Sequence, residues 1–170
     1  QFLAPHGICV DSKGDIYVVW AVKKKQSDKH KRHVNIYLSK SIDGGSTFLP
    51  PVQVNDHDGT AAVGWQLGPQ IGGDGENRVY ISYGDFREHQ PEIYLTVSTD
   101  DGETFSPSAP VTNRQLKIHE ILHAMSVSQD GKIYISWLDR SAESEGRGYG
   151  HHGIHVHVAR SIDGGRYFEP

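Results

Sequence analysis

The sequence predicts an all-β fold of the β-propeller type, with three four-stranded antiparallel blades in this chain. One eight-residue pattern occurs three times, at residues 41–48, 98–105 and 161–168. The copies recur at intervals a little longer than the roughly 40–50 residues of common four-stranded propeller blades. The residues before each copy repeat one order of short apolar strands and polar turns, so the whole chain consists of three similar units.

Each unit begins with a short alternating segment and a polar turn that contains a glycine. The first segments are residues 7–10, 69–72 and 124–127, and the turn glycines are Gly14, Gly75 and Gly131. A second segment, rich in β-branched and aromatic residues as strands are, follows at residues 15–20, 78–83 and 132–137. A variable polar loop leads to a third strand at 35–39, 92–96 and 155–159, and the fourth lies at 52–54 and 110–112. Four short antiparallel strands joined by turns make one propeller blade.

The repeated pattern has the chemistry of a tight turn between the third and fourth strands. Glycine at its fifth position permits the positive φ that a tight hairpin needs. An Asp two residues after a Ser can accept hydrogen bonds from turn amides, and we expect the final Phe to pack between blades. We interpret these residues as structural: Ser41, Asp43, Gly45, Thr47, Phe48, Ser98, Asp100, Gly102, Thr104, Phe105, Ser161, Asp163, Gly165 and Phe168. A calcium loop is the weaker interpretation, because the ligand ladder of an EF-hand loop is missing.

The pattern S-x-D-x-G-x-T-F resembles the Asp-box, or BNR repeat, of sialidases (neuraminidases) and related propellers. The third copy departs from it mildly, since Tyr167 takes the place of the usual Thr. The three copies are called the Asp-box segments below. The resemblance implies a six-bladed sialidase-type propeller around a central channel, with the Asp-boxes on the rim opposite the active site. It favours a secreted or cell-surface location, and it divides the chain into blades at about residues 6–55, 68–113 and 122–170.

Composition excludes several classes of protein. The chain has 170 residues, a formal net charge of −4 and a pI near 6.2, with 36% hydrophobic and 22% charged residues. A disordered tail and a membrane span are both excluded, since no apolar run approaches the roughly 20 residues that a spanning helix needs. The missing basic face argues against a nucleic-acid partner. The single cysteine, Cys9, rules out an intrachain disulfide and a cysteine-based zinc site.

The predicted topology places a candidate site on the rim opposite the Asp-box segments, where the second strands end and the chain passes between blades. A glycosidase of the sialidase type needs a carboxylic acid and a tyrosine that a glutamate activates. Asp85 and Asp139 stand where second strands emerge, Tyr149 lies in a glycine-rich loop, and Glu120 could be an acid or the partner of a tyrosine. These four residues are the catalytic candidates. The alternative for Asp85 and Asp139 is that they cap loop backbone and pair with neighbouring arginines.

A sialidase also clamps the substrate carboxylate with arginines, because the guanidinium fork matches two oxygens. The candidates for substrate binding are Arg87, Arg140, Arg114, His151 and His152. The Phe/Tyr-Arg-Ile-Pro motif of sialidases is absent, so a complete set of three arginines cannot be assigned. The histidine-rich loop could also suggest a metal, but the flanking sequence lacks a zinc-binding helix, and we predict neither metal nor cofactor.

Three functions remain open on the sequence. The first is a sialidase-like glycoside hydrolase, of which this chain is a partial propeller; the second is a non-catalytic Asp-box propeller that binds glycan or protein. The third is a structural repeat of a larger secreted protein. The expected partners are a carbohydrate or another small anionic ligand. Because exposed blade faces favour association, we also expect either the remaining propeller blades or a second copy of the chain.

Overall fold

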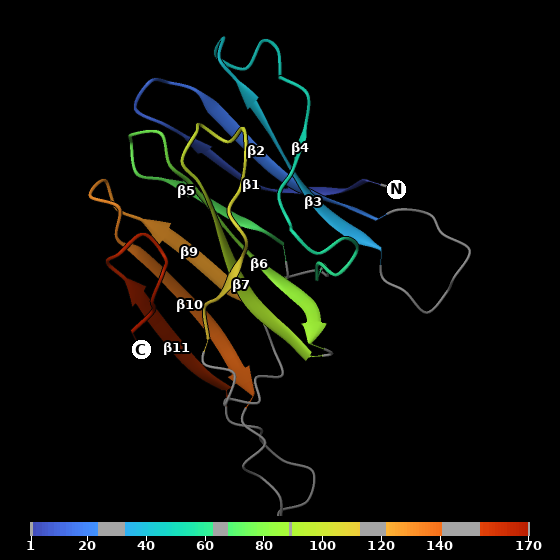
Figure 1. Ribbon diagram of the computed structural model, residues 1–170, viewed down its shortest axis with the longest axis vertical. Helices are drawn as coiled ribbons and strands as arrows, with labels where there is room; N and C mark the ends of the chain where they lie inside the picture. The colour runs from blue at the N-terminus through green and yellow to red at the C-terminus, as the bar shows by residue number, and fades with distance from the viewer. Residues whose placement is uncertain are drawn as a thin grey trace, which may run out of the picture.

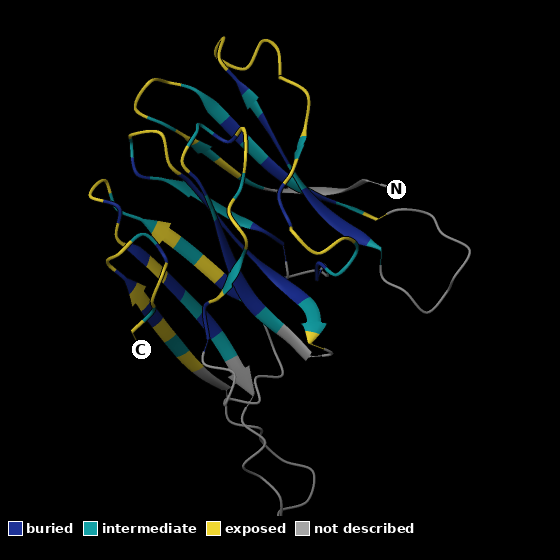
Figure 2. Cartoon of the chain, viewed as in Figure 1, coloured by how far each residue is buried: buried dark blue, intermediate teal, exposed yellow. Residues whose placement is uncertain are grey.

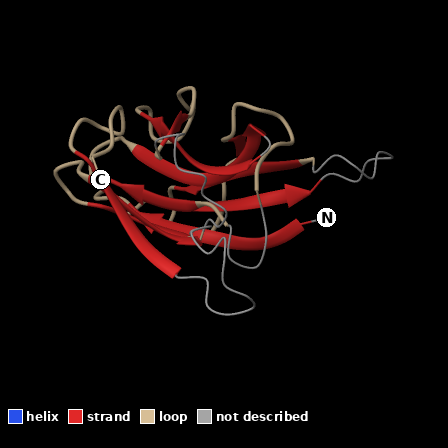
Figure 3. Cartoon of the chain, turned by 90° about the horizontal axis from the view of Figure 1, so that it is seen from below, coloured by secondary structure: helices blue, strands red, loops and turns tan. Residues whose placement is uncertain are grey.

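The computed structural model describes residues 2–23, 33–62, 68–88, 90–112, 122–140 and 154–169. Within these ranges every regular element is a β-strand, and the strands form three antiparallel sheets (Figures 1 and 3). The all-β, propeller-type fold predicted from the sequence is confirmed. Within the same ranges there is no helix that could cross a membrane.

The first two sheets have four strands each, in the order of the chain. The first contains β1 (Phe2–Val10), β2 (Ile16–Lys23), β3 (Val34–Ser41) and β4 (Val52–Gln53). The second contains β5 (Gln70–Gly73), β6 (Val79–Glu88), β7 (Gln90–Ser98) and β8 (Ala109–Pro110). Each strand is thus joined to its neighbour by one turn or loop, as in a blade.

The third sheet repeats this order with β9 (His123–Val127), β10 (Ile133–Arg140) and β11 (Ile154–Ser161). At the position of a fourth strand, Glu169 forms an isolated bridge with Arg160, and each backbone N–H donates to the other residue's carbonyl at 2.8 Å. The same bond to the third strand is made by the Leu49 N–H in the first sheet and the Ser106 N–H in the second. The three sheets therefore share one hairpin geometry.

Two apolar cores hold the sheets together, one at each junction (Figure 2). The core between the first and second sheets includes Val19, Ile36, Leu38, Ile81 and Tyr83. The core between the second and third includes Ile93, Leu95, Ile133, Ile135 and Trp137. Both faces of the second sheet are covered, whereas one face of the first and one face of the third are left open, so the sheets stack side by side as consecutive blades do.

The second and third Asp-box segments pack in one direction, each against the sheet that precedes it. Phe105 packs on the core of the first sheet and Phe168 on the core that contains the second. The expectation that all three phenylalanines pack between blades is wrong for Phe48 in this structure, where 47% of its surface is exposed. The physical reason is that no sheet precedes the first one among the described residues.

Inside each Asp-box segment, serine and aspartate side chains satisfy the turn backbone. The Ser41 hydroxyl donates to Asp43 Oδ1 at 2.8 Å and accepts from the Gly45 N–H at 2.9 Å. Asp43 also accepts from the Thr47 N–H and hydroxyl, at 2.9 and 2.6 Å, and these bonds from Thr47 lower the pKa of Asp43 to about 2. The other two segments repeat this pattern, except that Tyr167 supplies only its backbone N–H. Asp43 and Asp100 thus use both carboxylate oxygens in the turn, whereas the bonds to Asp163 all reach Oδ1.

Candidate functional site

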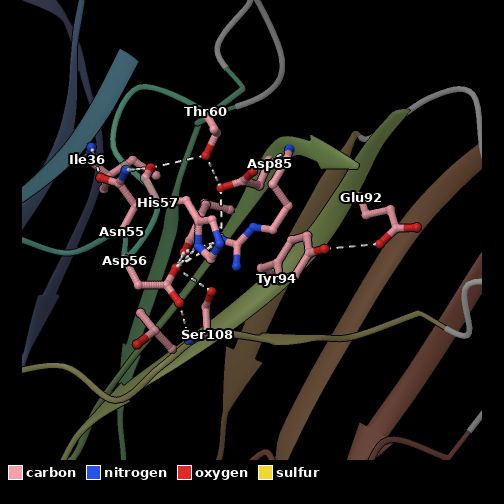
Figure 4. Close-up of polar contacts among 12 residues, drawn as sticks. Ile36, Asn55, Asp56, His57, Thr60, Asp85, Glu92, Tyr94 and Ser108 are labelled. Carbon is pink, nitrogen blue, oxygen red and sulfur yellow. Dashed lines mark hydrogen bonds and ion pairs between the residues drawn. The ribbon is translucent and has the colours of Figure 1, made fainter. Parts of the chain in front are cut away.

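A dense group of polar side chains lies on the rim opposite the Asp-box segments, at the junction of the first and second sheets (Figure 4). It is built from the end of β6, the start of β7 and the connector at residues 54–62, which leads from the first sheet toward the second. We call it the rim cluster: Asn35, Asn55, Asp56, Thr60, Tyr83, Asp85, Arg87, Glu92, Tyr94 and Ser108.

The connector is fixed to both sheets by its backbone. Thr60 forms a parallel bridge with Val34 of β3, and Ala61 forms an antiparallel bridge with Asp85 of β6. The Phe86 N–H donates to the Thr60 carbonyl at 3.0 Å, and the Ala62 N–H donates to the Gly84 carbonyl at 2.7 Å. The rim therefore has a defined backbone at this junction, on which side chains can be held in place.

Two buried asparagines shape the start of the connector. The Asn55 side chain accepts from the Ile36 N–H at 2.8 Å and donates to Asn35 at 3.0 Å and to the His57 carbonyl at 2.7 Å. The Asn35 oxygen also accepts from the Gly59 N–H at 2.6 Å. Since both amides are used in full by local partners, they define the turn and leave no group for a ligand.

Asp85 lies at the centre of the rim cluster and is fully buried. One carboxylate oxygen accepts from the Arg87 N–H at 2.8 Å, and the other accepts from the Thr60 hydroxyl at 2.8 Å and from the Arg87 guanidinium at 2.9 Å. A general acid must reach a glycosidic oxygen, and Asp85 has no such access. The observed bonds match the alternative interpretation, in which Asp85 caps loop backbone and pairs with an arginine, and a catalytic role for Asp85 stays a prediction.

Arg87 is held on three sides. Its guanidinium bridges Asp85 and Asp56, at 2.9 and 3.0 Å, and stacks over the Tyr94 ring at 4.0 Å from the centroid. Only 9% of its side chain is exposed. Burial lowers the pKa of the Arg87 guanidinium, but the hydrogen bond to Asp85 and the charge of Asp85 outweigh burial and raise that pKa above its usual range. The Arg87 guanidinium is thus already paired with two carboxylates, and its substrate-binding role stays a prediction.

Asp56 extends the ion pair from the first sheet to the outer edge of the second. It accepts from the Ser108 N–H at 3.0 Å, from the Ser108 hydroxyl at 2.7 Å, and from Arg87. Burial opposes ionisation of Asp56, but the bonds from Ser108 and the charge of Arg87 outweigh it and hold the pKa of Asp56 well below its usual range. Asp56 thus stays anionic and joins two sheets.

This pKa predicts how the Asp56→Asn variant will respond to acid. A carboxyl whose folded pKa is depressed contributes stability that is present above its unfolded pKa of about 3.9 and is lost as pH falls toward the folded value. We therefore expect the free energy of unfolding to fall less steeply below about pH 4 in Asp56→Asn than in the wild type. Urea titrations between pH 3 and 7 measure this slope, and equal slopes would contradict the assignment.

The other predicted site residues are placed only in part. Asp139 and Arg140 end β10 and pair with His155 and Ile154 of β11. By register Asp139 is equivalent to Asp85, but Arg140 is equivalent to Phe86, one position earlier than Arg87. Tyr149, Glu120, Arg114, His151 and His152 lie outside the described residues, so their roles stay predictions.

Sequence reasoning missed Asp56, Ser108 and the pair formed by Glu92 and Tyr94. The Tyr94 hydroxyl donates to Glu92 at 3.3 Å, which brings together the residue types of a glutamate-activated tyrosine. Tyr94 is buried, however, and its ring lies under Arg87, so it cannot attack a sugar from this position. The two side chains are two residues apart on one strand, and this spacing, which places them on the same face, was the signal available.

The rim cluster can hold loops in place, but it does not itself show an accessible acid or nucleophile. The Asp85–Arg87 pair at its centre is buried, and Asp56 and Glu92 are partly exposed but bonded to neighbouring side chains, so the cluster is a rigid base on which a substrate-contacting rim can stand. Among the described residues there is also no group of three or more His, Cys, Asp or Glu side chains that could hold a metal ion.

The stacked antiparallel sheets and the directional packing of the second and third Asp-box segments define blades of a β-propeller. No family model matches the chain. A curated protein named sialidase, from Bacteroides fragilis (strain YCH46), is 28% identical over 130 residues. The match covers 64% of this chain and 24% of that protein. The chain thus spans about a quarter of that relative.

Solved structures support the same fold. The Hadza microbial sialidase Hz136 aligns with 98% of this chain and 36% of its own length, with a TM-score of 0.67 and 16% identity. The GH93 α-L-arabinofuranosidase of Fusarium graminearum aligns with 96% of this chain and 46% of its own length, with a TM-score of 0.60 and 17% identity. At these identities the likeness shows the fold, and this fold is shared by enzymes that cleave different glycans.

Proposed function

We propose that the protein containing this chain is a sialidase-like glycoside hydrolase, and that this chain forms three blades of its propeller. The observation that carries the proposal is the rim cluster, which fixes the connector at one end of a propeller whose similar proteins, by name, act on glycans. Binding sites favour loops that a rigid scaffold positions.

In this proposal Asp85, Arg87 and Asp56 are positioning residues, and the groups that touch the substrate come from the neighbouring rim. The candidates that remain are Asp139, Tyr149 and Glu120 for catalysis, and Arg140, Arg114, His151 and His152 for substrate binding. Asp139 and Arg140 are the best supported, because they end β10 and Asp139 has the same register position as Asp85 in β6.

We further propose that additional blades of the same protein cover the two open sheet faces. The open face of the first sheet exposes Ile8 and Val10, and that of the third exposes Tyr134, Val156 and Val158. The second and third Asp-box segments each pack on the preceding sheet, so the exposed Phe48 marks where a preceding blade would lie. Apolar faces of this kind favour burial at about 25 cal/mol per Å².

The test is turnover of a fluorogenic sialoside by the complete protein, compared with Arg140→Ala. We expect hydrolysis by the wild type and a fall in kcat/KM of at least about tenfold in Arg140→Ala, since a charged hydrogen bond contributes about 1.5–3 kcal/mol. Arg160→Ala is the matched control, because Arg160 pairs with Glu169 away from this rim. A folded wild type that turns over no sialoside would overturn the hydrolase proposal.

A second candidate is a propeller that binds glycans without cleaving them. It is favoured by the rim cluster itself, in which the described acid and arginine are both used internally. Saturable binding to a glycan array, without turnover of any bound glycan, would select this candidate.

A further inference from the structure

A hollow lies at the rim that carries the Asp-box segments, on the opposite side of the molecule from the rim cluster. It occupies the junction between the second and third sheets and has a volume of about 770 Å³. Arg78, Thr104 and Ser106 line it from the second sheet, and Asp130, Gly164 and Arg166 line it from the third. Ligand sites commonly have volumes of about 300–1,000 Å³, so this groove has room for one or two sugar residues.

The junction between the first and second sheets carries the opposite charge at the equivalent positions. Asp15 precedes β2 as Arg78 precedes β6, and Asp101 and Glu103 stand in their Asp-box segment where Gly164 and Arg166 stand. Three acidic positions at one junction are thus replaced by two arginines and a glycine at the other.

Among the described residues an ion pair also crosses the first junction, and none crosses the second. Lys13 pairs with Asp101 across the two sheets at 2.9 Å, and Lys40 pairs with Asp15 at 2.7 Å. The positions of Asp101 and Lys40 are occupied by Gly164 and Val97 at the second junction, so neither pair can form there. The replacement of these side chains leaves the groove open and its arginines accessible.

The acidic side chains around the groove already make hydrogen bonds or ion pairs within the protein. Asp74 accepts from the Tyr80 hydroxyl at 3.1 Å and pairs with Arg78 at 3.5 Å, and Asp130 pairs with Lys132 at 2.7 Å. Asp163 accepts from Ser161 and from turn amides inside its own segment. Among the described residues no ion pair reaches the Arg166 guanidinium, which is therefore the cation available to an incoming anion.

Neutral groups in the same groove suit a sugar. The hydroxyls of Thr99 and Ser106 can bond to sugar hydroxyls, and Ile162, which is exposed, offers an apolar surface for a C–H face. A guanidinium binds carboxylate and sulfate through two parallel hydrogen bonds.

We propose that this groove is a binding site for an anionic saccharide, in which Arg166 holds a carboxylate or sulfate and Arg78, which is paired with Asp74, lines the same groove. The site is separate from the opposite rim, and it does not require the protein to be a hydrolase. Because the contact joins an accessible cation and an anion, binding weakens as salt is added.

Calorimetric titration of the complete protein with three disaccharides tests the proposal. The probes are digalacturonate, 6-O-sulfo-N-acetyllactosamine and uncharged N-acetyllactosamine, so that the first two distinguish a carboxylate ligand from a sulfate ligand. We expect saturable binding of at least one charged probe and a Kd at least about tenfold weaker in Arg166→Gln, equal to about 1.4 kcal/mol. Hydrogen exchange should slow in peptides that cover residues 99–107 and 162–166.

Arg160→Gln is the matched control, since it removes the same charge from β11 at its pair with Glu169. Arg166 is exposed, so Arg166→Gln should fold, and a thermal melt checks this. Equal binding of the uncharged probe, equal loss in Arg160→Gln, or slowed exchange only outside the two named segments would each overturn the proposal.

Discussion

Replacing Arg87 with methionine is expected to lower the stability of the protein by about 3–5 kcal/mol, because it leaves a buried carboxylate without its cation. Asp85 is fully buried, and the Arg87 side chain is only 9% exposed. The same substitution also removes the bond to Asp56 and the contact with the Tyr94 ring. Urea unfolding of the complete protein at pH 7 measures the loss.

Arg160→Met is the matched control for this prediction. Arg160 and Glu169 form an ion pair of similar length, 2.8 Å, but each side chain is 49% exposed. Exposed pairs contribute about 0–1 kcal/mol, so this variant should stay close to the wild type. If both variants lost the same stability, the special role assigned to the buried pair would be wrong.

A double variant separates lost charge pairing from lost packing. Asp85→Asn keeps one side-chain oxygen, which can accept from the Arg87 N–H, and gains an amide group that can donate to the Thr60 hydroxyl. Removing both charges of a buried pair is far less costly than removing one. Asp85→Asn with Arg87→Met should therefore be more stable than Arg87→Met alone, and a further loss would show that packing of the guanidinium dominates.

The fold was predictable because its signals are local. In an Asp-box segment the serine, aspartate and glycine all act within five residues, so the pattern alone indicates the turn, and three copies indicate three sheets. The packing of Phe48 was not predictable in the same way. Its contact is with a different sheet, and only the structure shows that each segment packs on the sheet before it.

The chemistry of the rim was less predictable, because it depends on contacts between sheets. The sequence places Asp85 and Arg87 at a strand end, which suits either catalysis or a structural pair. The structural pair also includes Asp56, which lies in the connector after the first sheet. Asp56 contacts both Arg87 and Ser108, which belong to the second sheet. No spacing within one unit reveals that contact. For Asp139 and Arg140, whose register differs by one position, the same choice stays open.

The second large effect is expected at Gly165, where the third Asp-box segment meets the second sheet. Its φ is +89°, and a Cβ there would lie 2.3 Å from Leu95 Cδ2 and 3.3 Å from Ile133 Cδ1. Gly165→Val should cost about 1–2 kcal/mol for the left-handed backbone and about 1–3 kcal/mol more for overpacking the core. Thermal and urea unfolding of the complete protein measure the sum.

Gly164→Val isolates the backbone contribution, because Gly164 has a φ of +76° but a Cβ added there would meet no other atom within 4 Å. We expect it to lose only the first of the two amounts. Since the remaining loss at Gly165 comes from Leu95, the Leu95→Ala substitution should cost less in the Gly165→Val background than in the wild type. Equal losses at the two glycines, or strict additivity with Leu95→Ala, would mean that this segment does not pack against the preceding sheet. Because the same segment carries Arg166 into the lining of the groove, such a result would also remove the structural basis of the anion-binding site.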